Sequence, residues 1–128
     1  MNRSRAWAPL LLAVAMSPAF SVSAATVDTG PSEYRSALSR LMAGDTLRLA
    51  PGDYMKGLPV HGLVGTEGAP IRIEASDASR RPRFIARQGH NTVSIVDSAY
   101  VEIRQLDIDG LGLAVDAVKA EGHARWAH

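Results

Sequence analysis

The interval between aliphatic residues is the feature of this sequence that most constrains its fold. Leu47, Ile71, Ile95 and Val118 recur at a nearly constant interval, each in a short segment where apolar and polar residues alternate. Such alternation is typical of a β-strand that buries one face. A fixed period in the range of about 20–50 residues is typical of a solenoid, in which each coil stacks on the one before it. The sequence therefore predicts a chain wound into stacked β-coils.

Residues 92–109 indicate how many strands one coil contains. Three segments can be placed there, separated by a few turn residues: Val93–Val96, Val101–Ile103 and Leu106–Ile108. This arrangement predicts the three-sided coil of a parallel β-helix. The alternative is a β-sandwich, whose strands prefer hairpin turns at intervals of about 8–12 residues. Hairpin signals are nearly absent here, and the LGL at residues 111–113 makes a two-residue hairpin at the preceding Asp-Gly awkward.

Residues 32–43 have the pattern of a one-sided helix that precedes the first coil. Its apolar positions recur at helical spacing: Tyr34, Leu38, Leu41 and Met42. Ser32 can cap the first turn, and Gly44 can end the last one. Because the end of a solenoid exposes an apolar core and unpaired strand edges, it needs a cover. We therefore expect a capping helix here, after a short polar lead at residues 26–31.

The segment at positions 1–24 has the three parts of a secretory signal peptide. Arg3 and Arg5 are followed by an apolar run at residues 6–15 and by Val-Ser-Ala at 22–24, a small-residue cleavage pattern. The run is shorter than the roughly 20 residues that a membrane span needs. The alternative, a retained membrane anchor, fits the alanine-rich end poorly. The expected organisation is a signal peptide at 1–24, a lead and capping helix at 25–44 and coils at 45–128, in a secreted or periplasmic protein.

Charge and cysteine content restrict the partners of the exported chain. Cleavage removes two arginines and no acid from a chain with 14 Lys and Arg and 13 Asp and Glu, so the mature protein is close to neutral. A near-neutral chain argues against nucleic acid as an electrostatic partner. With no cysteine, its stability must come from backbone ladders and apolar stacking. No stable membrane span is expected after signal cleavage.

Three runs of the sequence match a known pattern. Residues 41–54 (LMAGDTLRLAPGDY), 65–73 (GTEGAPIRI) and 100–110 (YVEIRQLDIDG) resemble the opening coils of secreted right-handed parallel β-helix proteins of the pectate-lyase-like superfamily. The resemblance implies an all-β, right-handed parallel β-helix with an N-terminal capping helix. Such proteins continue for many coils, and residues 122–128 look like the start of another strand. The chain is therefore expected to be an N-terminal fragment of about three coils, truncated before the fold is complete.

The resemblance also implies a class of function. Related enzymes cleave acidic polysaccharides by β-elimination, in which a cation, often Ca²⁺ or an Arg or Lys, neutralises the uronate carboxylate and a basic side chain removes the adjacent proton. Their catalytic residues lie on middle coils, so none can be transferred to this chain, and its catalytic residues stay unknown. The alternative is a non-catalytic β-helix, such as an adhesin or a sugar-binding stalk.

Asp107 and Asp109 are the candidate metal ligands. They alternate with Leu106 and Ile108, so both carboxylates are expected to point outward. With Asp97 or Asp116 on neighbouring coils they could bind Ca²⁺, which prefers several carboxylate oxygens. The simpler interpretation is a solvated acidic turn.

Arg72, Arg104 and Lys119 are the candidate substrate-binding residues. All three are expected to project outward from successive coils, where they could form a ladder along an acidic sugar chain. The simpler interpretation is that Arg72 pairs with Glu74 and Arg104 with Glu102 as surface ion pairs of small energetic value. The basic run at residues 80–83 is expected to be a solvated loop, and the histidines are expected to lie in turns.

Overall fold

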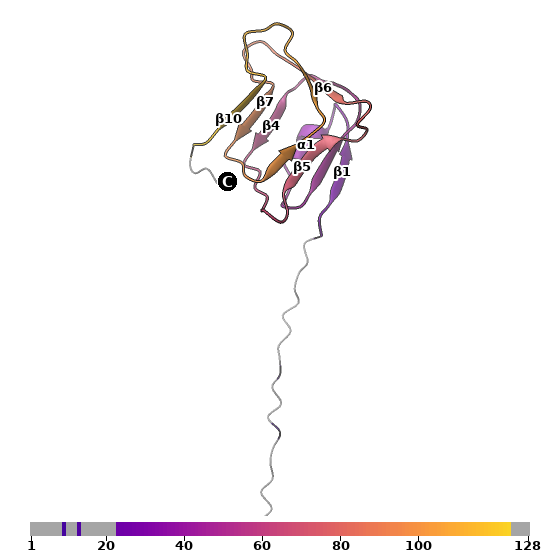
Figure 1. Ribbon diagram of the computed structural model, residues 1–128, viewed down its shortest axis with the longest axis vertical. Helices are drawn as coiled ribbons and strands as arrows, with labels where there is room; N and C mark the ends of the chain where they lie inside the picture. The colour runs from indigo at the N-terminus through magenta and orange to yellow at the C-terminus, as the bar shows by residue number, and fades with distance from the viewer. Residues whose placement is uncertain (1–8, 10–12, 14–22, 124–128) are drawn as a thin grey trace, which may run out of the picture.

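The protein is described by a computed structural model that covers residues 9, 13 and 23–123 (Figure 1). The predicted signal peptide falls, apart from residues 9, 13, 23 and 24, outside the described residues, as does most of the strand predicted at residues 122–128. The described elements are β1 (Thr26–Thr29), α1 (Tyr34–Leu38), β2 (Thr46–Leu49), β3 (Gly52–Tyr54), β4 (Leu58–His61), β5 (Ile71–Ala75), β6 (Pro82–Ile85), β7 (Val93–Val96), β8 (Val101–Ile103), β9 (Asp107–Asp109) and β10 (Val118–Glu121).

The strands form three sheets, and every pairing between them is parallel. Sheet A has the order β1-β2-β5-β8, sheet B the order β3-β6-β9 and sheet C the order β10-β7-β4. From β2 onward, the chain therefore passes through sheets A, B and C in the same order three times, and we call each passage through all three sheets a circuit. The protein is all-β with parallel sheets, as predicted. An antiparallel β-sandwich is excluded for residues 23–123.

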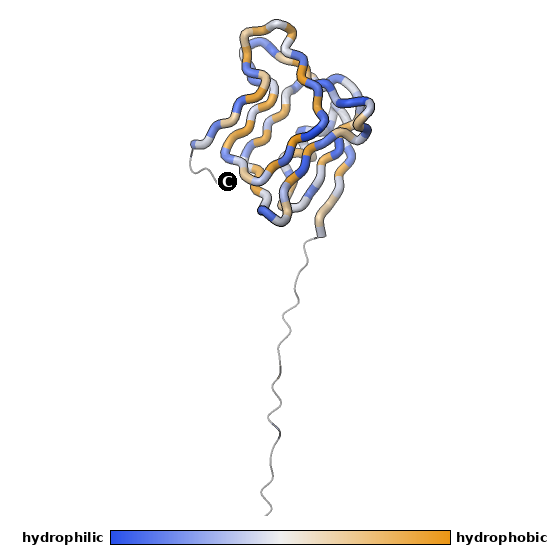
Figure 2. The backbone as a smooth tube through the Cα atoms, in the orientation of Figure 1, coloured by the Kyte–Doolittle hydropathy of each residue, from blue (hydrophilic) through white to orange (hydrophobic). Residues whose placement is uncertain are grey.

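The register between circuits differs from the constant interval that the sequence predicted. Leu47 pairs with Ile73, whereas the constant interval predicted Ile71. Ile73 in turn pairs with Ile103, and the interval between these two residues is wider than that between Leu47 and Ile73. Ile95 lies in sheet C opposite Val60 and does not stack on Ile71. The constant interval is wrong because the turns between strands differ in length from one circuit to the next. What is preserved is the alternation of apolar and polar residues along the strands, seen as alternating orange and blue in Figure 2.

Several strands are confirmed and others were not expected. The segments predicted at 93–96, 101–103 and 106–108 correspond to β7, β8 and β9, the last shifted by one residue to Asp107–Asp109, and they lie in three different sheets, as predicted for one coil. The expected polar lead at 26–31 is wrong, because Thr26–Thr29 forms β1 and pairs with β2. The expected loop at 80–83 is also wrong in its second half, where Pro82 begins β6, a position at which a strand tolerates proline.

The helix is shorter than predicted. It spans Tyr34–Leu38 and starts after Glu33, whose side chain makes no capping hydrogen bond, so Ser32 is not the N-cap. Asp45 accepts hydrogen bonds from the backbone N–H groups of Met42 and Ala25, at 2.8 and 2.9 Å. These bonds fix residues 42–45 in a turn, which explains why the helix does not continue to residue 43. Met42, predicted to be apolar and inward, is 61% exposed.

Helix α1 lies at the β1 end of the sheets and contacts β1, β2 and β4. Sheets B and C begin only with β3 and β4, so α1 takes the place of the strands that a preceding circuit would add to them. Its buried Tyr34 packs edge-on against Tyr54 and Phe84, with ring centroids 5.0 and 5.9 Å apart. The Tyr34 hydroxyl also donates a hydrogen bond to the carbonyl of Gly57. This is the position that a cap requires.

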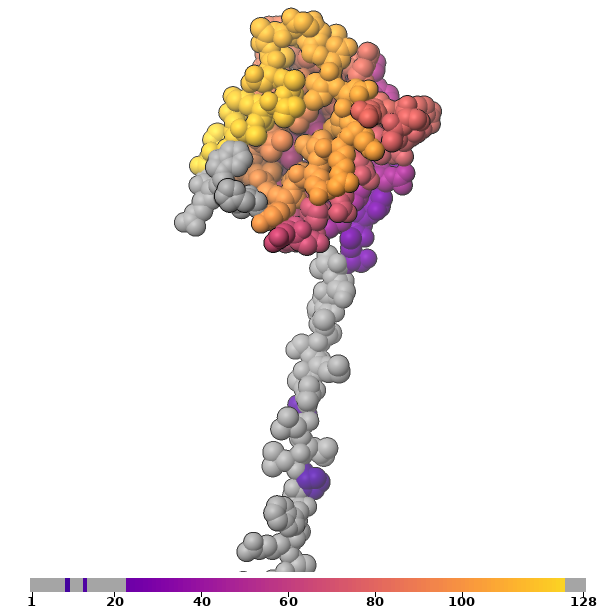
Figure 3. Space-filling view, viewed as in Figure 1, coloured from indigo at the N-terminus to yellow at the C-terminus, as the bar shows by residue number. Residues whose placement is uncertain are grey.

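The opposite end is open among the described residues. Strands β8, β9 and β10 are the last of their sheets, and their residues face the viewer in Figure 3, in orange and yellow. Inward side chains of the last circuits surround an apolar hollow of about 390 Å³, whose lining includes Val101, Ile103, Leu106, Ile108 and Val118. The described part of the protein therefore has one covered end and one exposed end. No described helix has the length and apolar character needed to cross a membrane.

Candidate functional site: a cationic pocket beside sheet C

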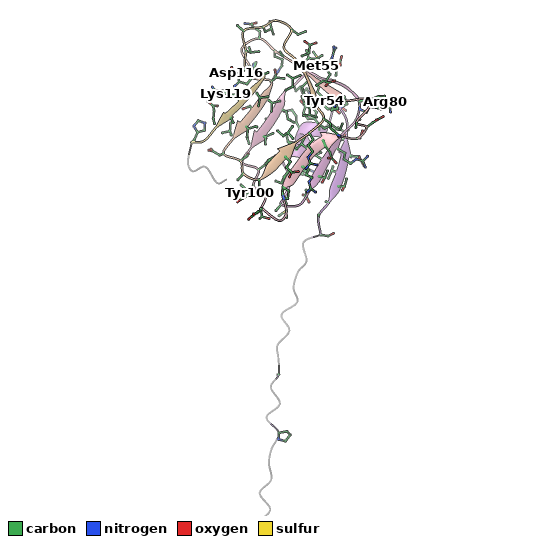
Figure 4. All side chains as sticks on the ribbon, in the orientation of Figure 1. Tyr54, Met55, Arg80, Tyr100, Asp116 and Lys119 are labelled. Atoms are coloured by element: carbon green, nitrogen blue, oxygen red, sulfur yellow. The ribbon has the colours of Figure 1, made fainter. Side chains whose placement is uncertain are left out.

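The structure does not bring the three predicted substrate-binding residues into one ladder. Arg72 lies on β5 and Arg104 directly after β8, both in sheet A, and both pair with Glu102. The Arg72 Nε atom is 3.1 Å from the Glu102 carboxylate. Lys119 lies on β10 in sheet C, where its Nζ is 2.9 Å from Glu121 (Figure 4). Each of these cations already faces a carboxylate, and Lys119 belongs to a different sheet from the two arginines.

The predicted calcium ligands also face cations. On β9, Asp107 lies 3.9 Å from Arg81 and Asp109 lies 3.4 Å from Arg83. Arg83 additionally pairs with Asp53 at 3.1 Å, so the basic run lies within a network of exposed ion pairs. Among residues 23–123, no group of three or more His, Cys, Asp or Glu side chains is close enough to hold a metal ion. The donor set therefore does not fit Ca²⁺ at Asp107 and Asp109.

Four cations in the described part of the chain form no ion pair with a carboxylate: Arg35, Arg40, Lys56 and Arg87. Three of these four line the same pocket of about 470 Å³. His61 and His90 also line it, whereas no Asp or Glu does. The pocket thus contains three of the four described cations that lack a carboxylate partner. Apart from Arg40, all other described arginines and lysines form ion pairs.

The floor of the pocket is the outer face of sheet C. In β4, Leu58 and Val60 point into the core, so the alternation turns Pro59 and His61 outward. Ser94 of β7 is the register partner of Pro59. The His61 Nε2 atom lies 3.0 Å from the Ser94 hydroxyl. Two adjacent parallel strands therefore supply a flat polar floor with one histidine fixed upon it.

The cations come from three separate segments at the rim. Arg35 lies on α1, Lys56 in the turn between β3 and β4, and Arg87 in the turn that follows β6. Gly57 makes room for Arg87: a Cβ at Gly57 would lie 2.8 Å from the Arg87 Nη2 atom. Gly57 also has a φ of +68°, a conformation that L side chains rarely adopt. The half-buried Arg87 guanidinium is thus held against the backbone at the edge of the pocket.

The electrostatics of the pocket favour an anion. Burial raises the pKa of the Tyr34 hydroxyl, while the charges of Arg35 and Arg87 oppose that rise. Both cations therefore act on the same buried hydroxyl. Positive groups that converge in a cleft, with no carboxylate among its lining residues, concentrate the field and attract negatively charged ligands. A carboxylate is well matched to Arg87, because a guanidinium can donate two parallel hydrogen bonds to it.

A second hollow continues from the first. It has a volume of about 500 Å³ and shares Gly89, His90 and Asn91 with the cationic pocket. Its remaining lining comes from residues 113–116, between β9 and β10. Asp116 is the only acidic residue in this lining, so the second hollow carries no cation surplus. The two hollows together form a surface longer than a single small anion requires.

No protein-family model, curated protein or solved structure matches this chain. Sequence reasoning missed Arg35, Lys56 and Arg87, because they are scattered over α1 and two turns. No pattern in the sequence marks them, because none of the three lies on a strand.

Proposed function

We propose that the chain is the N-terminal part of an exported, right-handed parallel β-helix protein that acts on an acidic polysaccharide. Three parallel sheets visited in a fixed cyclic order support the architecture. A helix at one end and an apolar opening at the other support the placement of this part at the N-terminal end of a longer coil.

The cationic pocket is the observation that carries the function. Arg35, Lys56 and Arg87 converge there without a carboxylate, whereas the other described arginines and lysines, apart from Arg40, all form ion pairs. An exported chain that is close to neutral after loss of Arg3 and Arg5 does not attract polyanions through its overall field. Attraction must therefore be local, and a carboxylate-bearing sugar offers both the charge and the hydroxyl groups that a polar pocket can bind.

The continuity of the two hollows favours a polymer over a free anion. A sugar chain that crosses the turn at residues 89–91 would place a uronate beside Arg87 and the hydroxyl groups of the neighbouring sugar beside residues 113–116, where the Asp116 carboxylate can accept hydrogen bonds from them. Affinity is then expected to rise with the number of sugar units until both hollows are filled. A small carboxylate would occupy only the cationic part.

For the whole protein we propose β-elimination as the reaction. In that reaction the uronate carboxylate is neutralised, which acidifies the adjacent C–H, and a base removes this proton. A C=C bond forms as the glycosidic C–O bond on the neighbouring carbon breaks, and the leaving oxygen takes up a proton. Arg87 and Lys56 fit the neutralising role, whereas the described carboxylates do not fit a Ca²⁺ ion. Because the pocket residues belong to the first circuits, a complete set of catalytic groups is expected from circuits beyond these.

A non-catalytic sugar-binding module is the second candidate. The pocket contains no carboxylate that could serve as a base, and the Nε2 atom of His61 is already hydrogen-bonded to Ser94. These features suit retention of a ligand better than its cleavage. Appearance of an unsaturated uronate product, followed by its ultraviolet absorbance, would separate the enzyme from the binding module.

Calorimetric titration of the purified protein with a panel of uronate oligomers tests the proposal. Arg87→Gln should lower affinity roughly 10- to 100-fold, because a hydrogen bond to a charged group is worth about 1.5–3 kcal/mol. Arg48→Gln is the matched control, since Arg48 lies on sheet A and pairs with Asp28. If Arg72→Gln and Arg104→Gln weaken binding and Arg87→Gln does not, the site lies on sheet A and the pocket assignment is wrong.

A further inference from the structure

Thr92 is the one polar side chain in the buried core of the described residues, at 2% exposure. Its Oγ1 atom is buried and has no hydrogen-bond partner within that part of the chain. A buried hydroxyl without a partner opposes folding, and a valine of the same shape would avoid this penalty. Thr92 is also part of the wall of the cationic pocket. A polar group that is unpaired in the free protein but stands at a binding site indicates a contact with a ligand.

Both backbone polar groups of Thr92 form hydrogen bonds, so its hydroxyl is the only polar group of the residue without a partner. Its N–H donates to the carbonyl of Asp116 at 3.1 Å, and its carbonyl accepts from the N–H of Leu58 at 2.8 Å. These bonds fix the residue between β4 and the segment that leads into β10. The position of the hydroxyl is therefore set by the fold and does not depend on a flexible loop.

Thr92 lies in the bend directly before β7, whose first residue, Val93, is buried in the core. Ser94 and Thr92 both line the cationic pocket. A Cβ added at Gly57 would lie 2.9 Å from the Thr92 carbonyl and 2.8 Å from Arg87 Nη2, so Thr92 and the guanidinium are close neighbours across Gly57.

We propose that Thr92 determines the specificity of this pocket for a sugar acid: its hydroxyl hydrogen-bonds an uncharged oxygen of the sugar whose carboxylate is held by Arg87. The inference rests on the proposed function and goes one step beyond it. Arg87 alone would accept any carboxylate. The additional hydroxyl selects a ligand that carries a hydroxyl or ring oxygen at a fixed distance from its charge.

Two ligands and two substitutions at position 92 test this role. The ligands are the uronate oligomer that the wild-type protein binds most tightly and poly-L-glutamate, which is acidic but has no sugar oxygens. Thr92→Val should reduce affinity for the uronate about tenfold and leave the affinity for polyglutamate unchanged. Thr92→Ser should restore most of the uronate affinity. Thermal unfolding without ligand should show Thr92→Val to be at least as stable as the wild type.

The outcomes separate this inference from the proposed function. If the wild-type protein binds no uronate oligomer, both fail. If the wild type binds uronate and Thr92→Val binds it equally well, the specificity role of Thr92 is overturned while the proposed function stands. If Thr92→Val weakens uronate and polyglutamate alike and also lowers the melting temperature, Thr92 is a structural residue and the inference is again overturned.

Discussion

Gly65→Ala is expected to be among the most damaging single-methyl changes in this protein. Gly65 lies in the corner between β4 and β5, and an added Cβ would be 2.5 Å from the Tyr100 carbonyl oxygen and 2.9 Å from the Ile71 nitrogen. Both atoms belong to the backbone, so no side chain can rotate out of the way. Gly68, in the same corner, has no heavy atom within 4 Å of its Cβ position. Neither glycine has a left-handed φ, which makes the two alanine substitutions a matched pair.

The size of the expected destabilisation follows from the backbone atoms that the added methyl group must displace. The Tyr100 carbonyl would have to shift by about half an ångström, and it accepts the hydrogen bond from the Ile71 N–H at 2.9 Å. Overpacking of this kind typically costs about 1–3 kcal/mol, and a weakened backbone hydrogen bond adds about 1 kcal/mol. Gly65→Ala should therefore lower the free energy of unfolding by about 2–4 kcal/mol. Gly68→Ala should raise it by about 0.4–1 kcal/mol, because alanine restricts the unfolded chain.

Urea unfolding followed by far-ultraviolet circular dichroism measures both values. The wild type and the two variants should share one slope against denaturant, so that differences in midpoint report stability. The reasoning is refuted if Gly65→Ala unfolds within about 0.5 kcal/mol of the wild type. It is also refuted if the two alanines destabilise the protein equally, since the contact at Tyr100 would then explain nothing.

Two further predictions concern the aromatic cluster under the cap. Phe84→Ala should lower the free energy of unfolding by about 3–5 kcal/mol, because Phe84 is fully buried and stacks on Tyr54 with ring centroids 4.8 Å apart; chemical denaturation measures this loss. Burial, with a smaller contribution from Tyr34, raises the pKa of Tyr54 to about 12. Because an unfolded tyrosine ionises near pH 10, stability should fall as the pH rises from about 10 to about 12, and Tyr54→Phe should weaken that dependence in denaturation curves.

The strands could be predicted from sequence where apolar and polar residues alternate over four or more positions. Such alternation identified Thr46–Leu49, Ile71–Ala75 and Val93–Val96. It did not identify β3, which consists of three residues and begins with glycine at a φ of +138°. The residues that pair between neighbouring circuits could not be predicted either, because this pairing depends on the lengths of the turns, and these lengths vary from one circuit to the next. Periodicity thus predicts the class of fold but not which residues of neighbouring strands pair.

The candidate site was harder to predict for a physical reason. A strand pattern shows which side chains point outward, but not which outward charges are already neutralised by a neighbour from another circuit. Arg72 was expected to pair with Glu74 on its own strand, yet it pairs with Glu102 on β8, the adjacent strand from the next circuit. Only the register reveals such pairs. The ion pairs of the structure also show, by elimination, that Arg35, Lys56 and Arg87 are left without carboxylates at one pocket.

The apolar end formed by β8, β9 and β10 provides the last prediction. Ile108 is 36% exposed and Val118 is 54% exposed there, although both occupy inward positions of their strands. Under the proposed architecture a further circuit covers them, so the chain on its own should self-associate through this end. Replacing both residues with lysine should shift the protein toward monomer in sedimentation velocity over a range of concentrations. Met42→Lys, in the exposed turn between α1 and β2, should not. A wild-type chain that stays monomeric and unfolds cooperatively would show that this end needs no cover, and the proposal of further circuits would then fall.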